Sequence, residues 1–201
     1  MRTDRLAMPY LPARRCLSAA LMVLACVIAM LSIPPVSAQG GSASARTLER
    51  SVKAAFLYKF LGYTEFPAAA FSDPAAPVVI GVVDADDMAA ELTRIVAGRT
   101  VGTRPIAVRS MKEGDPTTGV HLLFLSSSAT AIAARISRGP QQPMLLVTES
   151  ESGLAHGSVI NFRIIDQRVR FDVSLDAADK YNVKLSSRLL TVAHQVHKGV
   201  N

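Results

Sequence analysis

The stretch VVIGVV, residues 78–83, is a continuous run of apolar and mostly β-branched residues. A strand buried on both faces has this composition, and such strands are typical of parallel sheets that are covered by helices on both sides. Two similar runs follow, VHLLFLS at residues 120–126 and PMLLVTES at residues 143–150. Three such strands predict an α/β protein with a largely parallel sheet at its centre.

Helical patterns precede and separate these strands. Apolar residues recur every three or four positions from Thr47 to Gly62, and again after the aspartates at 84–87 as far as about Ala97. A third helix is predicted over about 129–138, where Ser126-Ser127-Ser128 can cap its start. The alternation in RPIAVRS, residues 104–110, predicts a strand nearer the edge of the sheet.

The C-terminal part of the chain follows a different pattern. SVINFRII (158–165) and RVRFDVS (168–174) alternate apolar and polar residues around Asp166-Gln167, which predicts a β-hairpin. A short helical turn is expected over 175–181, and a last amphipathic helix from Ser186 to about His197.

The order of these elements predicts the fold class. We expect an α/β three-layer sandwich, in which a central mixed sheet is flanked by helices. The first part of the sheet is mostly parallel, and the hairpin adds an antiparallel part late in the chain.

The N-terminus has the three-part layout of a secretory signal peptide. Four arginines precede an apolar run from Cys16 to about Ile33, and Pro-Pro-Val-Ser-Ala then leads to a predicted cut after Ala38. An uncleaved membrane anchor and lipid attachment at Cys26 are the alternatives. We therefore predict a signal peptide at 1–38, a flexible linker at 39–46 and one domain at 47–198, in the periplasm.

Composition excludes several classes of function for the exported chain. The net charge of +6 falls to +3 once residues 1–38 leave, because four arginines and one aspartate go with them. No basic stripe remains, so nucleic-acid binding is not expected. Both cysteines, Cys16 and Cys26, lie in the leader, which leaves no thiol for a disulfide, a metal site or catalysis.

Catalytic motifs are missing from the sequence. It has no Gly-x-Ser-x-Gly, no His-Glu-x-x-His and no phosphate-binding loop. Asp84, Asp86 and Asp87 follow the first buried strand, where helix capping is favoured over metal binding. His194 and His197 are expected to face solvent near a helix end. We predict no enzyme, no catalytic residue, no metal and no cofactor.

The stretch KAAFLYKFLGYTEFP, residues 53–67, gathers aromatic residues that are scarce elsewhere. Phe56 and Phe60 are spaced to pack inward from one helix face, whereas Tyr58 lies about 200° away from Phe56. Tyr58, with Leu57 or Leu61, is therefore the candidate for a second contact with a dimer mate, a partner or a ligand. The alternative is that the second neighbour belongs to the same chain.

Three stretches together resemble the YfiR family, the domain of unknown function DUF4154. They are VKAAFLYKFLGYTEFP at 52–67, HLLFLSSS at 121–128, and the segment from LLVTES to SSRLL at 145–190. The resemblance runs from about Ser51 to Ala193. Phe66 stands where the family commonly has Trp. The residues that match family motifs are Lys53, Tyr58, Phe66, Pro67, Asn161, Phe162, Phe171 and Leu190.

The resemblance implies a function. It implies a periplasmic regulator that binds and represses the periplasmic sensor domain of an inner-membrane diguanylate cyclase, which lowers cyclic-di-GMP and biofilm formation. It also implies a homodimer. Lys53, Tyr58, Phe66 and Asn161 become candidate contacts to a partner or ligand, while Phe162 and Phe171 are expected to pack in the core.

One alternative function stays open at this stage. The chain can instead be a periplasmic small-molecule-binding sensor module with a different membrane partner. Its pocket would lie near Asp84, Ser126 and Glu149, because ligands bind at the carboxyl ends of strands in open α/β sheets.

Overall fold

The computed structural model describes residues 39–127 and 130–199, and the chain from Ser42 onward forms one compact unit. The predicted leader, its cut after Ala38 and Cys26 lie outside the described residues, as does Ser128 of the predicted cap. Within the described ranges, no helix is both long and apolar enough to cross a bilayer.

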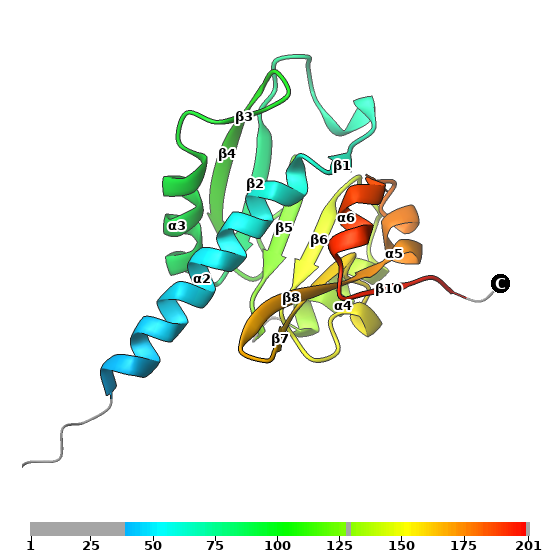
Figure 1. The fold of residues 1–201 in the computed structure, drawn as a ribbon. Coiled ribbons are helices and arrows are strands. Elements are labelled where there is room, and N and C mark those ends of the chain that lie inside the picture. Colours follow the sequence, from blue (N-terminus) through cyan, green and yellow to red (C-terminus); the bar gives the residue numbers. More distant parts are fainter. Residues whose placement is uncertain (1–38, 128–129, 200–201) are drawn as a thin grey trace, which may run out of the picture. The chain divides into compact units, whose positions relative to one another are not determined.

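An eight-stranded mixed sheet forms the centre of the domain, in the order β10-β8-β7-β6-β5-β2-β4-β3, and β1 pairs with β9 in a separate two-stranded sheet (Figure 1). The helices are α2 (Gln39–Leu61), η1 (Ala68–Ala70), α3 (Asp86–Val96), α4 (Thr130–Arg138), η3 (Leu154–His156), α5 (Leu175–Lys180) and α6 (Ser187–Val192). The strands are β1 (Thr64–Glu65), β2 (Val78–Val83), β3 (Thr100–Val101), β4 (Arg104–Met111), β5 (Leu122–Leu125), β6 (Leu145–Thr148), β7 (Ile160–Ile165), β8 (Arg168–Ser174), β9 (Lys184–Leu185) and β10 (Gln195–His197).

The three apolar runs form the buried middle of the sheet, as predicted. β5 pairs in parallel with both β2 and β6, and every residue of β5 and β6 is buried. Helices cover both faces, so side chains on either side of these strands leave water. The α/β class with a mixed sheet between helical layers is confirmed.

The connections place a crevice at one end of the sheet. The chain runs from β2 through α3 to β4 in one direction across the sheet, and from β5 through α4 to β6 in the other. Because such crossovers are right-handed, α3 and α4 cover opposite faces (Figure 1). The carboxyl ends of β2 and β5 therefore flank a topological switch point, where open α/β sheets bind ligands.

The predicted hairpin is β7–β8, joined to the parallel part by pairing of β7 with β6. Phe162 lies directly opposite Phe171, and both are buried, as expected. Asp166 and Gln167 form the turn with φ of 49° and 59°. Two central residues with positive φ are the pattern of a type I′ turn, whose twist matches that of the strands.

Helix α2 has two neighbours within its own chain. Leu57 and Leu61 are at most 1% exposed in the hydrophobic core. Phe60 stacks on Phe162 at 5.7 Å and meets Phe171 edge-on at 5.0 Å. The prediction that Leu57 or Leu61 serves an external contact is wrong, because α2 packs against both the sheet and the hairpin.

Two segments differ from their predicted structure. Residues 39–46, predicted to be a flexible linker, belong to α2, which begins at Gln39. The last helix ends at Val192 rather than near His197, and Gln195–His197 form β10, which pairs in parallel with β8. The open edge of β8 offers unpaired backbone groups, and this pairing overrides the helical pattern.

Candidate functional site

Lys53 lies at the centre of the site, on the face of α2 that passes over the strand ends. Its side chain is only 9% exposed, and Nζ donates to Glu149 Oε2 at 2.7 Å and to Glu49, one turn earlier in α2. Burial alone disfavours the ammonium, but the hydrogen bonds to Glu149 and Glu49 outweigh it and raise the pKa of Lys53. Lys53 is therefore a charged group held between two carboxylates.

Glu149 connects three separate parts of the chain. It follows β6 directly, and its side chain is 18% exposed. One carboxylate oxygen accepts from Lys53 on α2, and the other accepts from the backbone N–H of Ser127 after β5, at 3.3 Å. The ends of two neighbouring strands and the covering helix are thus tied together at one carboxylate.

A second ion pair joins α2 to α3. Arg50 Nη1 lies 2.7 Å from Asp87 Oδ2, with side chains 33% and 83% exposed. An ion pair this open to water contributes little stability, in the range of about 0–1 kcal/mol. Its effect is to position the Arg50 guanidinium across the gap between the two helices.

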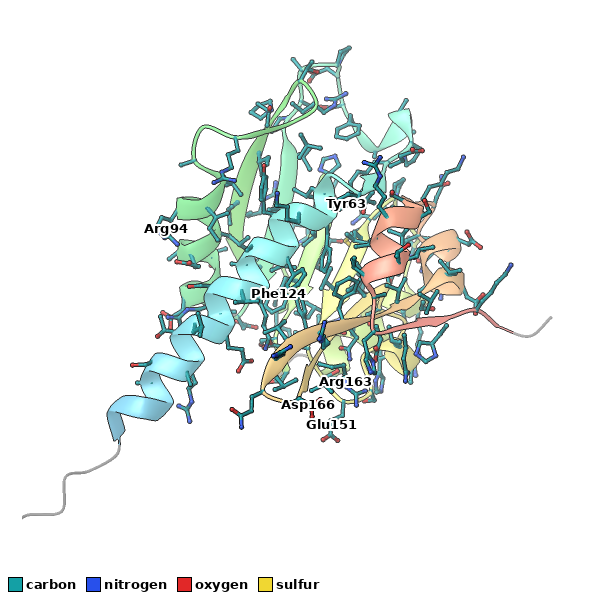
Figure 2. All side chains as sticks on the ribbon, viewed as in Figure 1. Tyr63, Arg94, Phe124, Glu151, Arg163 and Asp166 are labelled. Carbon is teal, nitrogen blue, oxygen red and sulfur yellow. The ribbon has the colours of Figure 1, made fainter. Side chains whose placement is uncertain are left out.

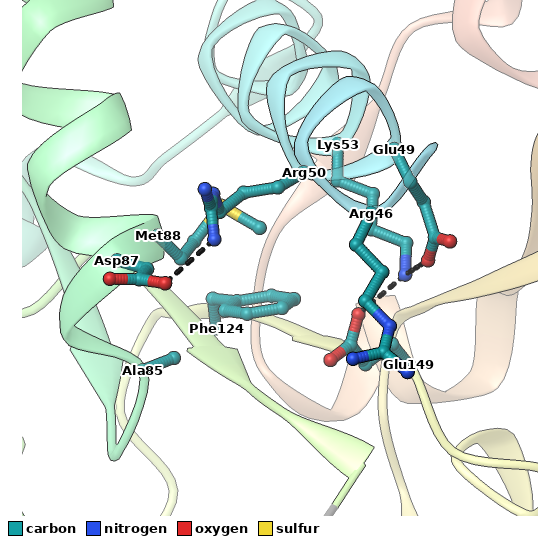
Figure 3. Close-up of a pocket in the computed structure, with 9 residues that line it drawn as sticks. All are labelled: Arg46, Glu49, Arg50, Lys53, Ala85, Asp87, Met88, Phe124 and Glu149. Carbon is teal, nitrogen blue, oxygen red and sulfur yellow. Dashed lines mark hydrogen bonds and ion pairs between the residues drawn. The ribbon is translucent and has the colours of Figure 1, made fainter. Parts of the chain in front are cut away.

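The ion pairs of Lys53 and Arg50 line a pocket of about 240 Å³ (Figure 3). Figure 3 shows Lys53 pointing from α2 between Glu49 and Glu149, with the ring of Phe124 beneath the helix. Within the described ranges, Arg46 has no recorded ion pair. The lining residues are Arg46, Glu49, Arg50, Lys53, Ala85, Asp87, Met88, Phe124 and Glu149.

The pocket combines an apolar floor with charges of both signs. Its volume lies below the usual 300–1,000 Å³ of ligand sites, so it suits a group of few atoms. No set of three or more histidine, cysteine or acidic side chains is placed to hold a metal ion within the described part of the chain. The arrangement provides charge recognition at the switch point of the sheet.

The acidic cluster after β2 does not join this pocket as a unit. Asp86 accepts from Ser110 Oγ at 2.6 Å, and Lys112 Nζ lies 3.3 Å from Asp86 and 3.7 Å from Asp84. The hydrogen bond from Ser110, and then Lys112, lower the pKa of Asp86. Asp86 and Asp87 occupy the first turn of α3, where the helix dipole favours negative charge. The N-cap residue itself is Ala85, which makes no capping hydrogen bond through its side chain.

Tyr58 is half-buried on the side of α2 near β3. The guanidinium of Arg99 lies 5.0 Å from the centroid of its ring, which is within the range of a cation–π contact. A shallow hollow of about 330 Å³ that includes Tyr58, Lys59 and Tyr63 opens beside it. Tyr58 is therefore accessible to a second molecule, but it lies apart from the residues that line the Lys53 pocket.

Phe66 belongs to an aromatic cluster under the loop that contains η1. Its ring meets Phe71 at 6.3 Å and His121 at 5.7 Å, both edge-on. His121 Nδ1 accepts from the backbone N–H of Val79 at 3.1 Å, so its Nε2 carries the proton and donates to the Ala70 carbonyl, also at 3.1 Å. The cluster holds this loop against β2.

The charge state of His121 is set by its surroundings. The side chain is 3% exposed and stacks on Phe71 at 4.4 Å, while Arg104 lies over the same ring at 3.8 Å. Burial, and then the positive charge of Arg104, lower the pKa of His121. The imidazole is therefore held in its neutral form.

Asn161 is 1% exposed, and its contacts are internal. Thr148 Oγ1 donates to Asn161 Oδ1 at 2.7 Å and is hydrogen-bonded to the Ser158 hydroxyl at 2.9 Å. A Cβ at Gly153 would lie 2.1 Å from Thr148 Oγ1 and 2.3 Å from Asn161 Oδ1. The hydrogen bond between Thr148 and Asn161 is a structural contact, and it fixes the loop after β6.

Of the residues that the sequence analysis names, Lys53, Asp87 and Glu149 line the pocket, whereas Asp84 and Ser126, which were expected to line it with Glu149, do not. The four candidates Lys53, Tyr58, Phe66 and Asn161 occupy four different surroundings. Arg50 and Phe124 were not singled out. Asp87 carried a signal, since it follows a buried strand, but Arg50 on a helix surface had none.

The C-terminal histidines His194 and His197 are exposed, as predicted, but the helix expected to contain them ends before them. His194 lies after α6, not within a helix, and its Nδ1 is 3.0 Å from Oδ1 of the buried Asp172 on β8. Its side chain is 37% exposed. The contact helps to hold β10 against the sheet edge.

The fold and the site define an α/β domain with a charged pocket at the switch point of its sheet, the place where open α/β sheets bind ligands. The family model DUF4154, described as YfiR/HmsC-like, matches residues 50–194, and the chain belongs to this family. Its members are periplasmic regulators of diguanylate cyclases rather than enzymes. No curated protein matches the chain significantly.

Proposed function

We propose that the protein is a non-catalytic regulator in the periplasm. It binds the periplasmic sensor domain of an inner-membrane diguanylate cyclase and keeps the cyclase inactive, which lowers cyclic-di-GMP and limits biofilm formation. The family match over residues 50–194, nearly the whole domain, is the observation that carries this proposal.

The predicted signal peptide supports a periplasmic location. A cut after Ala38 releases a chain that starts at Gln39, and that chain contains no cysteine, so oxidising conditions cannot cross-link it. Regulation by a disulfide is therefore not available to this protein. Mass spectrometry of the protein purified from periplasm tests the cut, and a mass that retains residues 1–38 or carries a lipid on Cys26 would contradict it.

Repression is tested in cells. Deleting the gene should raise cyclic-di-GMP and biofilm mass, and expression of the wild-type chain in the deletion strain should bring both back down to their normal levels. Tyr58→Glu is expected to restore them less well, because a charge replaces an accessible ring. Unchanged cyclic-di-GMP in a deletion strain that expresses its membrane cyclases would refute the proposal.

We also propose a homodimer, which the family resemblance supports. Sedimentation of the purified domain tests this at micromolar concentration, and a monomer throughout would contradict it.

A second candidate function rests on the Lys53 pocket. A buried lysine between two glutamates, at the switch point of the sheet, favours a sensor module that takes a small charged ligand. A thermal-shift screen with nucleotides, amino acids and peptidoglycan fragments tests it. A ligand that stabilises the wild type but not Lys53→Met would support this function, and no stabilisation by any of them would remove it.

A further inference from the structure

An open apolar groove runs between α2 and the β7–β8 hairpin. It has a volume of about 670 Å³, and most of its wall is apolar. We call it the α2–hairpin groove. Its principal lining residues are Leu48, Val52, Phe56, Ile164, Arg168 and Val169.

The groove exposes large apolar side chains to water. Among the described residues, Leu48 at 67% and Ile164 at 51% are two of the five large apolar side chains that are strongly exposed, and both line this groove. Ile164 pairs with Val169 across the hairpin, on the side that faces α2. A contiguous apolar patch of this kind marks an interaction surface, whereas single exposed residues need no explanation.

The shape of the groove fits a helix. Ala45, Leu48, Val52 and Phe56 form one stripe of α2, about 16 Å long at 1.5 Å per residue. Ala55, beside this stripe, is exposed and small, so a second helix can approach α2 closely there. β6 pairs with β7 only at Ile160 and Asn161, and β10 pairs with β8 only at Asp172–Ser174, so the choice of a helix rests on the apolar stripe of α2.

Two exposed arginines of the hairpin lie on its other face. Arg163 and Arg170 are directly opposite each other across the two strands, but they alternate with Ile164 and Val169 and so lie on the face turned away from α2. Like charges in this position are destabilising. The carboxylate of Asp172 lies 3.9 Å from Arg163 Nη1 (labelled in Figure 2) and 3.0 Å from His194 Nδ1.

The balance of charge at the groove is positive. Glu49, the acidic residue of its lining, is bonded to Lys53. Arg168 lines the groove and forms no ion pair with any residue of 39–127 or 130–199. A partner with a carboxylate beside its apolar surface would pair with Arg168, which also speeds association.

We propose that the α2–hairpin groove receives an amphipathic helix of a partner protein, with acidic residues flanking its apolar face. This inference rests on the proposed function, in that the helix is assigned to the periplasmic domain of the repressed cyclase. Helix-in-groove recognition of this type uses apolar anchors spaced at i, i+3 or i+4 and i+7.

Binding experiments with matched variants test the groove. The probes are the purified periplasmic domains of the membrane diguanylate cyclases of the source organism. We expect Leu48→Glu and Ile164→Glu each to weaken binding at least about tenfold, since a desolvated anchor is replaced by a charge. Val192→Glu is the control, because Val192 is 62% exposed on α6 and lies outside the groove lining.

Charge and footprint give two independent readouts. Arg168→Glu should weaken binding and reduce its dependence on salt. Hydrogen exchange on the wild-type complex should show protection over residues 45–56 and 164–169. This measurement needs no variant, so it decides the question even where a substitution disturbs the fold.

The outcomes separate the two proposals. A wild-type chain that binds none of the cyclase domains overturns the proposed function, and the groove assignment with it. A wild-type chain that binds, with Leu48→Glu and Ile164→Glu binding equally well and no protection along the groove, overturns the groove assignment alone. Weakened binding by both groove variants and not by Val192→Glu supports both.

Discussion

Replacement of Lys53 by methionine is the most direct test of the pocket. The substitution keeps the length of the side chain but removes the ammonium that Glu49 and Glu149 share. Breaking a fully buried pair costs about 3–5 kcal/mol, and an exposed one about 0–1 kcal/mol. Lys53 is 9% exposed and its carboxylates 38% and 18%, so water can partly reach the abandoned charges. We expect a loss of about 2–3 kcal/mol.

The matched control is Arg50→Met. Arg50 lies on the same helix, three residues earlier, and also bridges α2 to another element, but its pair with Asp87 is open to water. We expect this variant to lose less than about 1 kcal/mol. Urea denaturation at pH 7 measures the free energy lost by each variant. In a thermal scan, the Lys53 variant should melt roughly 4–12 °C below the wild type, at about 2–4 °C per kcal/mol for a domain of this size.

The pH dependence provides a second check. The pKa of Lys53 is raised in the folded protein, so the stability it contributes is fully present below the pKa of an unfolded lysine, about 10.4, and is lost only as pH rises through the folded value. The difference between wild type and Lys53→Met should therefore stay constant from pH 7 to 9.5. Equal losses for the Lys53 and Arg50 variants would refute the reasoning, because burial would then not distinguish the two pairs.

Three further predictions concern the scaffold. His121 is held neutral with a lowered pKa, so the unfolding free energy should fall as pH drops below about 6.5. Urea denaturation between pH 7.5 and 5.5 measures this fall, and it should be smaller in His121→Gln. Gly153→Ala should cost about 2 kcal/mol or more because its Cβ collides with the Thr148–Asn161 bond, whereas Gly139→Ala, with no atom nearer than 3.5 Å, should cost less than about 0.5 kcal/mol by the same assay. Gln167→Gly should stabilise the hairpin turn by about 1 kcal/mol, since glycine adopts a φ of 59° without strain, and an unchanged or lower denaturation midpoint would contradict this.

Local sequence determined the elements whose structure depends on neighbouring residues. VVIGVV, HLLFL and MLLVT could be recognised as buried strands because short, nearly continuous apolar runs are typical of strands that are covered on both faces. The hairpin was also predictable, since Phe162 and Phe171 flank a two-residue turn and alternate inward. Lys53 could be named as a candidate only through the family motif that it matches.

Only the tertiary structure decided how distant segments meet. Lys53 and Glu149 are 96 positions apart, and their contact exists because α2 crosses the ends of the parallel strands. The groove depends on Leu48 and Ile164, which share no local pattern. Gln195–His197 became a strand because the open edge of β8 supplied backbone partners. Periodicity in the sequence shows which side of a helix or strand is apolar. Which segment packs against that side depends on how the chain connects the elements and on which backbone groups still need hydrogen-bond partners.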